Sequence, residues 1–238
     1  MRRKLIWLVP ALFGAVLSLV FLAYTGMYYH ADTQALAALE TDENVTVTKT
    51  DYGWYFDGPA EENVHVFYPG AKVEETAYAP LLHRLADNGM DACLVKMPFR
   101  LAVLGAGKAA KIPETADYAN VYIGGHSLGG AMAANYAADH ADELSGVILL
   151  AAYPTKELDD DLQLISIYGS EDGVLNMEKV KDGGQYAPEQ TVEQIIAGGN
   201  HAYFGDYGEQ KGDSEARITA QEQQEETAEI ILENVDRN

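Results

Sequence analysis

The segment 124–130, with the sequence GGHSLGG, limits the possible folds of this chain more than any other stretch. It follows a short apolar run at 121–123 and precedes a helix-like run at 131–138. Glycines on both sides of Ser127 let a strand turn sharply into a helix, because a Cβ atom there would clash with neighbouring backbone. The pattern predicts a strand, a tight turn with strained backbone angles at Ser127, and a helix after it.

Glycine-x-serine-x-glycine between a strand and a helix is the pattern of a nucleophile turn. The serine hydroxyl is presented at the tip of the turn, and the backbone N–H of the next residue, Leu128, points to the same place. That N–H can stabilise the oxyanion that forms when a serine attacks a carbonyl carbon. The alternative is a glycine-rich turn that contains a serine by chance, so residues further along the chain must decide. His126 is expected to pack or hydrogen-bond beneath the turn.

A serine hydroxyl is a poor nucleophile until a histidine accepts its proton and a carboxylate orients that histidine. Two later strands run into loops that carry both groups, the acid before the base. The strand expected at 162–168 leads to Asp172, the predicted acid, with Glu171 as the second choice. Asp172 has an alternative role as an ordinary cap of the following helix. The strand expected at 191–196 leads through a glycine-rich loop to His201, the predicted base.

A second oxyanion donor is expected in the loop after the apolar run 64–68, where the sequence reads PGAK. The backbone N–H of Ala71 is the first candidate, and those of Gly70 and Lys72 are alternatives. Proline followed by glycine also favours a simple type II turn, and both interpretations are compatible.

Strand and helix patterns alternate along most of the chain, which indicates an α/β fold. We expect a three-layer, mostly parallel sheet with helices on both faces, an antiparallel edge formed by the first two strands, and a minimal cap. The Gln/Glu-rich run 221–226 is interpreted as a solvated helix face. Strands are predicted at 45–50, 52–56, 64–68, 92–97, 121–123, 146–152, 162–168 and 191–196; helices at 75–88, 131–138, 174–180 and 218–235; and a loose helix or cap at 101–110.

The amino terminus predicts a membrane anchor. Three basic residues at 2–4 precede an uncharged, mainly apolar run at 5–24, which as a helix is about 30 Å long and matches a bilayer core. The basic cluster should stay cytoplasmic, so the rest of the chain is expected on the extracytoplasmic side of the cell membrane as a single-pass protein. A cleaved signal peptide is the competing interpretation. We therefore divide the chain into an anchor at 1–25, a stalk at 26–44 and a folded domain at 45–238.

Charge and cysteine content narrow the function further. The formal net charge is -21, and such a surface is expected to repel nucleic acid and anionic lipid headgroups. The single cysteine, Cys93, lies in an apolar run and is expected to be a buried small hydrophobe. No sequence pattern of metal ligands is present, so no metal site is expected.

With serine, acid and base in this order, the chain resembles the α/β-hydrolase superfamily, and more narrowly its small bacterial "α/β hydrolase fold-5" or dienelactone-hydrolase-like group. The resemblance covers about residues 45–235, and its most specific parts are the turn at Ser127 and the segments FYPGAKV and VKMPFRLA. It implies hydrolysis of a small-molecule ester, or less readily a thioester or amide, through an acyl-serine intermediate and without metal or cofactor. Dienelactone hydrolases carry a cysteine where this chain has Ser127, which argues against their substrate.

Two other functions are compatible with the same residues. The first is acyl transfer to a hydroxyl of the cell envelope, which uses the same serine, histidine and aspartate. The second is a non-catalytic, membrane-tethered module that keeps only the fold, since a fold does not fix a function.

Overall fold

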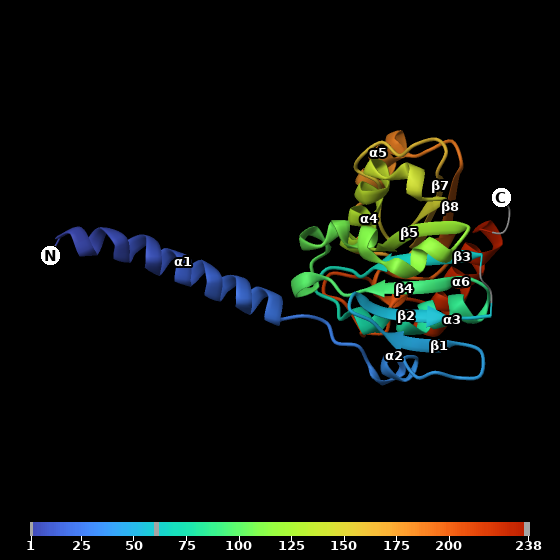
Figure 1. The fold of residues 1–238 in the computed structure, drawn as a ribbon, viewed down its shortest axis with the longest axis horizontal. Coiled ribbons are helices and arrows are strands. Elements are labelled where there is room, and N and C mark those ends of the chain that lie inside the picture. The colour runs from blue at the N-terminus through green and yellow to red at the C-terminus, as the bar shows by residue number, and fades with distance from the viewer. Residues whose placement is uncertain (1, 60–61, 236–238) are drawn as a thin grey trace.

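The computed structural model describes residues 2–59 and 62–235, with the backbone alone for residues 2–9 and 11. Its centre is an eight-stranded sheet in the order β1-β2-β4-β3-β5-β6-β7-β8 (Figure 1). β1 pairs with β2, and β2 with β4, in antiparallel fashion, whereas every later pair is parallel. The expected mostly parallel sheet with an antiparallel edge is confirmed. The strands are β1 (Thr46–Lys49), β2 (Gly53–Asp57), β3 (Asn63–Tyr68), β4 (Asp91–Val95), β5 (Asn120–His126), β6 (Gly146–Leu150), β7 (Gln163–Gly169) and β8 (Thr191–Ile196).

Helices cover both faces of this sheet, and they bury the side chains that its inner strands direct to each face. α3 and α6 pack on one face, where Leu82 and Ile231 join Phe67 and Ile165 in one core cluster. α4 packs on the other face through a row of alanines against Val66 and neighbouring strand residues. The helices are α1 (Arg2–Gly26), α2 (Thr33–Ala37), α3 (Ala79–Asp87), α4 (Leu128–Asp139), α5 (Met177–Gly183) and α6 (Ala220–Val235).

Three local predictions differ from the structure. The segment 101–110, expected as a loose helix or cap, lies in a series of short 3-10 turns at 98–117, which we call the cap segment. The helix expected at 174–180 begins only at Met177, because the backbone at 174–175 turns around the side chain of Asp172 instead. The run 221–226 is not wholly solvated, since Gln223 and Gln224 are buried. Cys93 is fully buried as expected, and burial raises the pKa of its thiol to about 12.

The amino-terminal helix α1 projects from the rest of the molecule as a separate rod (Figure 1). After it, Tyr29 forms a parallel bridge with Val73, and Asp32 donates its backbone N–H to the carbonyl of Asp206, so this stretch is held on the domain. Within the described part of the chain, no helix has the length and apolar character needed to cross a bilayer. The membrane anchor therefore stays a prediction.

Candidate active site

The turn at Ser127 has the strained geometry that its sequence predicts. Ser127 lies between β5 and α4 with φ 53° and ψ -122°, a backbone conformation that residues other than glycine rarely adopt. A Cβ atom at Gly129 would lie 2.2 Å from the carbonyl oxygen of Tyr68, so only glycine lets α4 start this close to β3. Ser127 is half-buried at the carboxyl end of β5, and its hydroxyl is presented at the edge of the sheet where the parallel strands end.

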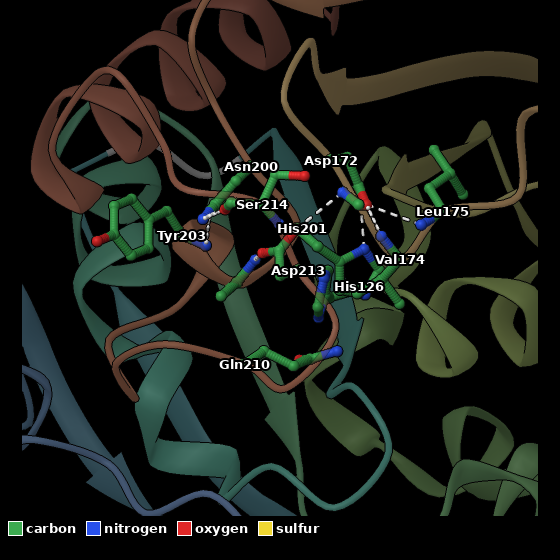
Figure 2. Close-up of polar contacts among 12 residues, drawn as sticks. His126, Asp172, Val174, Leu175, Asn200, His201, Tyr203, Gln210, Asp213 and Ser214 are labelled. Carbon is green, nitrogen blue, oxygen red and sulfur yellow. Dashed lines mark hydrogen bonds and ion pairs between the residues drawn. The ribbon is translucent and has the colours of Figure 1, made fainter.

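His201 and Asp172 meet in the loops that follow β8 and β7 (Figure 2). The ring atom Nδ1 of His201 lies 2.8 Å from Oδ2 of Asp172, and only 2% of each side chain is exposed. A buried carboxylate in this position fixes the tautomer in which Nδ1 carries the proton and Nε2 is free to accept one. Nε2 of His201 is buried and has no hydrogen-bond partner among the described residues.

The carboxylate of Asp172 has a second function that the sequence also suggested. Its Oδ1 accepts hydrogen bonds from the backbone N–H groups of Val174, at 2.8 Å, and Leu175, at 2.7 Å. Asp172 therefore both caps the turn and contacts His201, so the two interpretations of this residue hold together. Glu171 instead lies 3.3 Å from the guanidinium of Arg217, on the outside of the loop.

Ser127 and His201 line the same pocket, which has a volume of about 250 Å³. Leu128 also lines it and begins α4, so its N–H belongs to the first helical turn, where N–H groups have no partner within the helix. The other lining residues are Ala131, Ala151, Ala152, Tyr153, Val174, Leu175 and Asn176. Two predicted catalytic residues and one predicted oxyanion donor thus face one small cavity, with Asp172 behind His201.

The structure distinguishes the three backbone N–H groups that the sequence offered as the second oxyanion donor. Gly70 donates to the hydroxyl of Tyr78, and Lys72 donates to the carbonyl of Arg100. Among the described residues, Ala71 N–H has no acceptor. Ala71 follows β3, whose last residue pairs with Gly125 in β5, so it lies at the same sheet edge as Ser127.

A buried chain of hydrogen bonds supports this loop from below. The hydroxyl of Tyr78 accepts the N–H of Gly70 at 3.1 Å and lies 2.8 Å from Nδ1 of His126. The ring of His126 in turn lies 4.5 Å from the ring of His201. Burial, and next the nearby His201, hold the pKa of His126 well below its usual value, so this ring is neutral at pH 7. His126 thus hydrogen-bonds beneath the turn, as its position in the sequence indicated.

Two residues outside the predicted set hold the loops that carry the acid and the base. Asp213 accepts the N–H of Gly173 through one oxygen and that of Ala202 through the other, both at 2.9 Å, so it ties the two loops together (Figure 2). Gln223 of α6 accepts the N–H of Asn200 and donates to its carbonyl. No local sequence signal marks Asp213. Gln223 lies in the Gln/Glu-rich run 221–226, whose composition predicts a solvent-exposed helix face.

Comparisons with known proteins agree with this geometry. A family model described as "Alpha/beta hydrolase family" matches residues 64–225. Similar solved structures include Est1E from Butyrivibrio proteoclasticus, with 15% identity, a TM-score of 0.54, and coverage of 82% of this chain and 100% of that one. Dienelactone hydrolase from Anabaena variabilis has 13% identity, a TM-score of 0.53 and coverage of 82% and 98%.

A third structure covers the whole chain. It is described as a membrane phospholipase A and a bacterial virulence factor, and it has 14% identity, a TM-score of 0.57, and coverage of 99% of this chain and 98% of that one. At these identities the structural likeness shows a shared fold. Among curated protein sequences, none matches this chain.

Proposed function

Because this chain belongs to the alpha/beta hydrolase family, we propose that it is a serine hydrolase that cleaves an ester through an acyl-serine intermediate. The observation that carries the proposal is the pairing of His201 with Asp172 behind a pocket that Ser127 also lines. A buried His–Asp pair that shares a pocket with a strained serine supports this assignment, because a histidine oriented by a carboxylate can activate a hydroxyl nucleophile.

In the proposed reaction, Oγ of Ser127 attacks the ester carbonyl carbon while Nε2 of His201 takes the hydroxyl proton. The backbone N–H groups of Leu128 and Ala71 stabilise the negative oxygen of the tetrahedral intermediate. His201 then gives its proton to the departing alcohol, which leaves an acyl group on Ser127. Water attacks this acyl-serine and transfers a proton to His201, and the acid leaves as the proton returns to Ser127. Asp172 orients His201 throughout and stabilises its protonated form.

The test is Ser127→Ala, assayed against a short p-nitrophenyl ester and a fluorophosphonate label. We expect turnover to fall by about 10⁴-fold or more and labelling to be lost, because both need the hydroxyl. Ser145→Ala is the control, since Ser145 lies at the opposite end of the strands, just before β6. Labelling or turnover of Ser127→Ala at the wild-type level would show that Ser127 is not the nucleophile.

We also propose that α1 anchors the protein in the cell membrane with its catalytic domain outside the cytoplasm. The motivating observations are the basic residues at 2–4 and the apolar side chains of α1, such as Leu12 and Leu19, which are two-thirds exposed. Protease added to intact cells should digest the domain. Protection of the domain until the cells are lysed would contradict this orientation.

A further inference from the structure

The cap segment carries a charge opposite to that of the rest of the protein. The chain has 37 acidic and 16 basic residues, yet the stretch 92–113 contains no acidic residue. Its four basic residues are Lys96, Arg100, Lys108 and Lys111. We call residues 96–111 the cap strip. A local positive field on a strongly acidic protein selects for negatively charged partners.

Most of these cations are not neutralised by the protein itself. Lys96 lies 3.3 Å from Glu75, but in the described part of the chain no carboxylate pairs with Lys108, Lys111 or Arg100. Lys72, which lies beside the strip, is unpaired in the same sense and faces the ring of Tyr24 instead. Lys108 donates to the backbone carbonyl of Lys96, which leaves its charge uncompensated.

Apolar side chains lie between these cations and point to solvent. Phe99, Val103 and Leu104 are each 51% exposed. Exposed apolar residues that alternate with unpaired cations are typical of a surface that docks on anionic lipid, where the apolar groups enter the headgroup boundary and the cations meet phosphates.

The cap strip contacts the end of α1. The rings of Phe99 and Phe21 lie 5.2 Å apart, and the guanidinium of Arg100 lies 3.3 Å from the centre of the Tyr28 ring. The turns that follow β4 accordingly lie on the side of the domain from which α1 departs (Figure 1). A membrane that holds α1 would therefore be close to the cap strip.

The cap strip is also hydrogen-bonded to residues at the carboxyl ends of the parallel strands, where Ser127 lies. The N–H of Lys72, next to the proposed oxyanion donor Ala71, donates to the carbonyl of Arg100, and the hydroxyl of Tyr68 donates to the carbonyl of Ala106. The pocket at Ser127, about 250 Å³, is smaller than the roughly 300–1,000 Å³ of pockets that enclose a drug-sized ligand. A long acyl ester would bind with only its reacting end inside the pocket.

We propose that the cap strip docks on the anionic phospholipid surface in which α1 is anchored, and that the substrate is an ester lipid drawn from that bilayer. The lipid substrate rests on the proposed hydrolase function. The docking surface is inferred independently from the charge, exposure and contacts of the cap strip.

The experiment uses the full chain in nanodiscs of phosphatidylcholine alone or mixed equally with phosphatidylglycerol. Two rates are measured, release of fatty acid from the disc lipid and turnover of a water-soluble p-nitrophenyl ester. For the double variant Lys108→Glu/Lys111→Glu, we expect lipid hydrolysis in the anionic discs to fall by about tenfold or more. Turnover of the soluble ester should not change. The matched control is Lys179→Glu/Lys181→Glu on α5, which makes the same charge change away from the strip.

A binding measurement separates docking from catalysis. A polarity-sensitive fluorophore on Leu104→Cys should brighten in anionic discs, whereas the same label on Glu189→Cys, before β8 at the opposite sheet edge, should not. Equal signals from the two labels would overturn the docking surface. Turnover of the soluble ester with no release of disc lipid would overturn the lipid substrate and leave the hydrolase proposal intact. Brightening at position 104 with no turnover of either ester would support the docking surface and contradict the hydrolase proposal.

Discussion

The two carboxylate oxygens of Asp172 have different partners, so an Asp172→Asn variant can separate their functions. Oδ2 meets Nδ1 of His201 at 2.8 Å, whereas Oδ1 accepts the N–H groups of Val174 and Leu175. Asparagine keeps one acceptor oxygen, and the two backbone donors should hold it toward the turn. Its NH₂ group then faces His201, which must place its proton on Nε2 and can no longer accept one from Ser127.

The expected loss in kcat for Asp172→Asn is on the order of 10⁴-fold, or about 5.5 kcal/mol of transition-state stabilisation. The fold should be little affected, because the turn keeps its cap. Asp172→Ala should lose a similar factor in kcat and also destabilise the domain. The lost cap costs about 1 kcal/mol, and the unpaired Nδ1–H of a buried His201 costs a further 1–3 kcal/mol or so.

Steady-state kinetics on a short p-nitrophenyl ester and urea unfolding of the three proteins check this reasoning. Glu171→Gln is the control, and it should change kcat little because Glu171 contacts exposed Arg217 rather than His201. If Asp172→Asn keeps more than about a tenth of the wild-type kcat, the carboxylate does not set the tautomer of His201. If Glu171→Gln loses as much activity as Asp172→Asn, Glu171 is the acid.

Two further predictions concern buried groups beneath the site. Tyr78→Phe removes the acceptor for Gly70 N–H and the partner of His126. We expect kcat in the same assay to fall by about tenfold with KM unchanged. An unchanged kcat would show that this network does not position the oxyanion loop. Burial lowers the pKa of His65 from 6.5 to about 3. The folded protein therefore keeps His65 neutral, while the unfolded chain protonates it below pH 6.5. The free energy of unfolding should fall by about 1.4 kcal/mol per pH unit as the pH drops from 6.5 toward 3. His65→Leu should flatten this loss between pH 7 and 5 in urea unfolding, and an unaltered slope would mean that other groups cause it.

The sequence predicted the mostly parallel sheet and the order of its strands and helices along the chain. These features depend on local patterns, since apolar periodicity and the glycines around Ser127 act over a few residues. The same reasoning placed Ser127, Asp172 and His201 after the ends of three strands of one parallel sheet, β5, β7 and β8. Because the ends of neighbouring parallel strands meet at one edge, strand position alone was enough to nominate residues that the fold brings together.

Other features depended on contacts between distant segments. The segment 101–110, predicted as a loose helix or cap, folds as short 3-10 turns. Gln223 is buried because Asn200 offers it both a donor and an acceptor. Asp213 ties two loops that are far apart in sequence, and nothing in its neighbours marks it.

The sequence by itself determined the candidate residues for the proposed chemistry, because a strained serine, a carboxylate and a histidine each need a recognisable local setting. Only the tertiary structure decided that Asp172 rather than Glu171 contacts His201, and that Ala71 N–H, unlike those of its neighbours, has no acceptor among the residues that the structure describes. It also decided that Arg100 of the cap strip stacks on the ring of Tyr28, just after α1. These outcomes depend on the directions of side chains and N–H groups in loops, and those directions are set by packing against segments that lie far away in the chain.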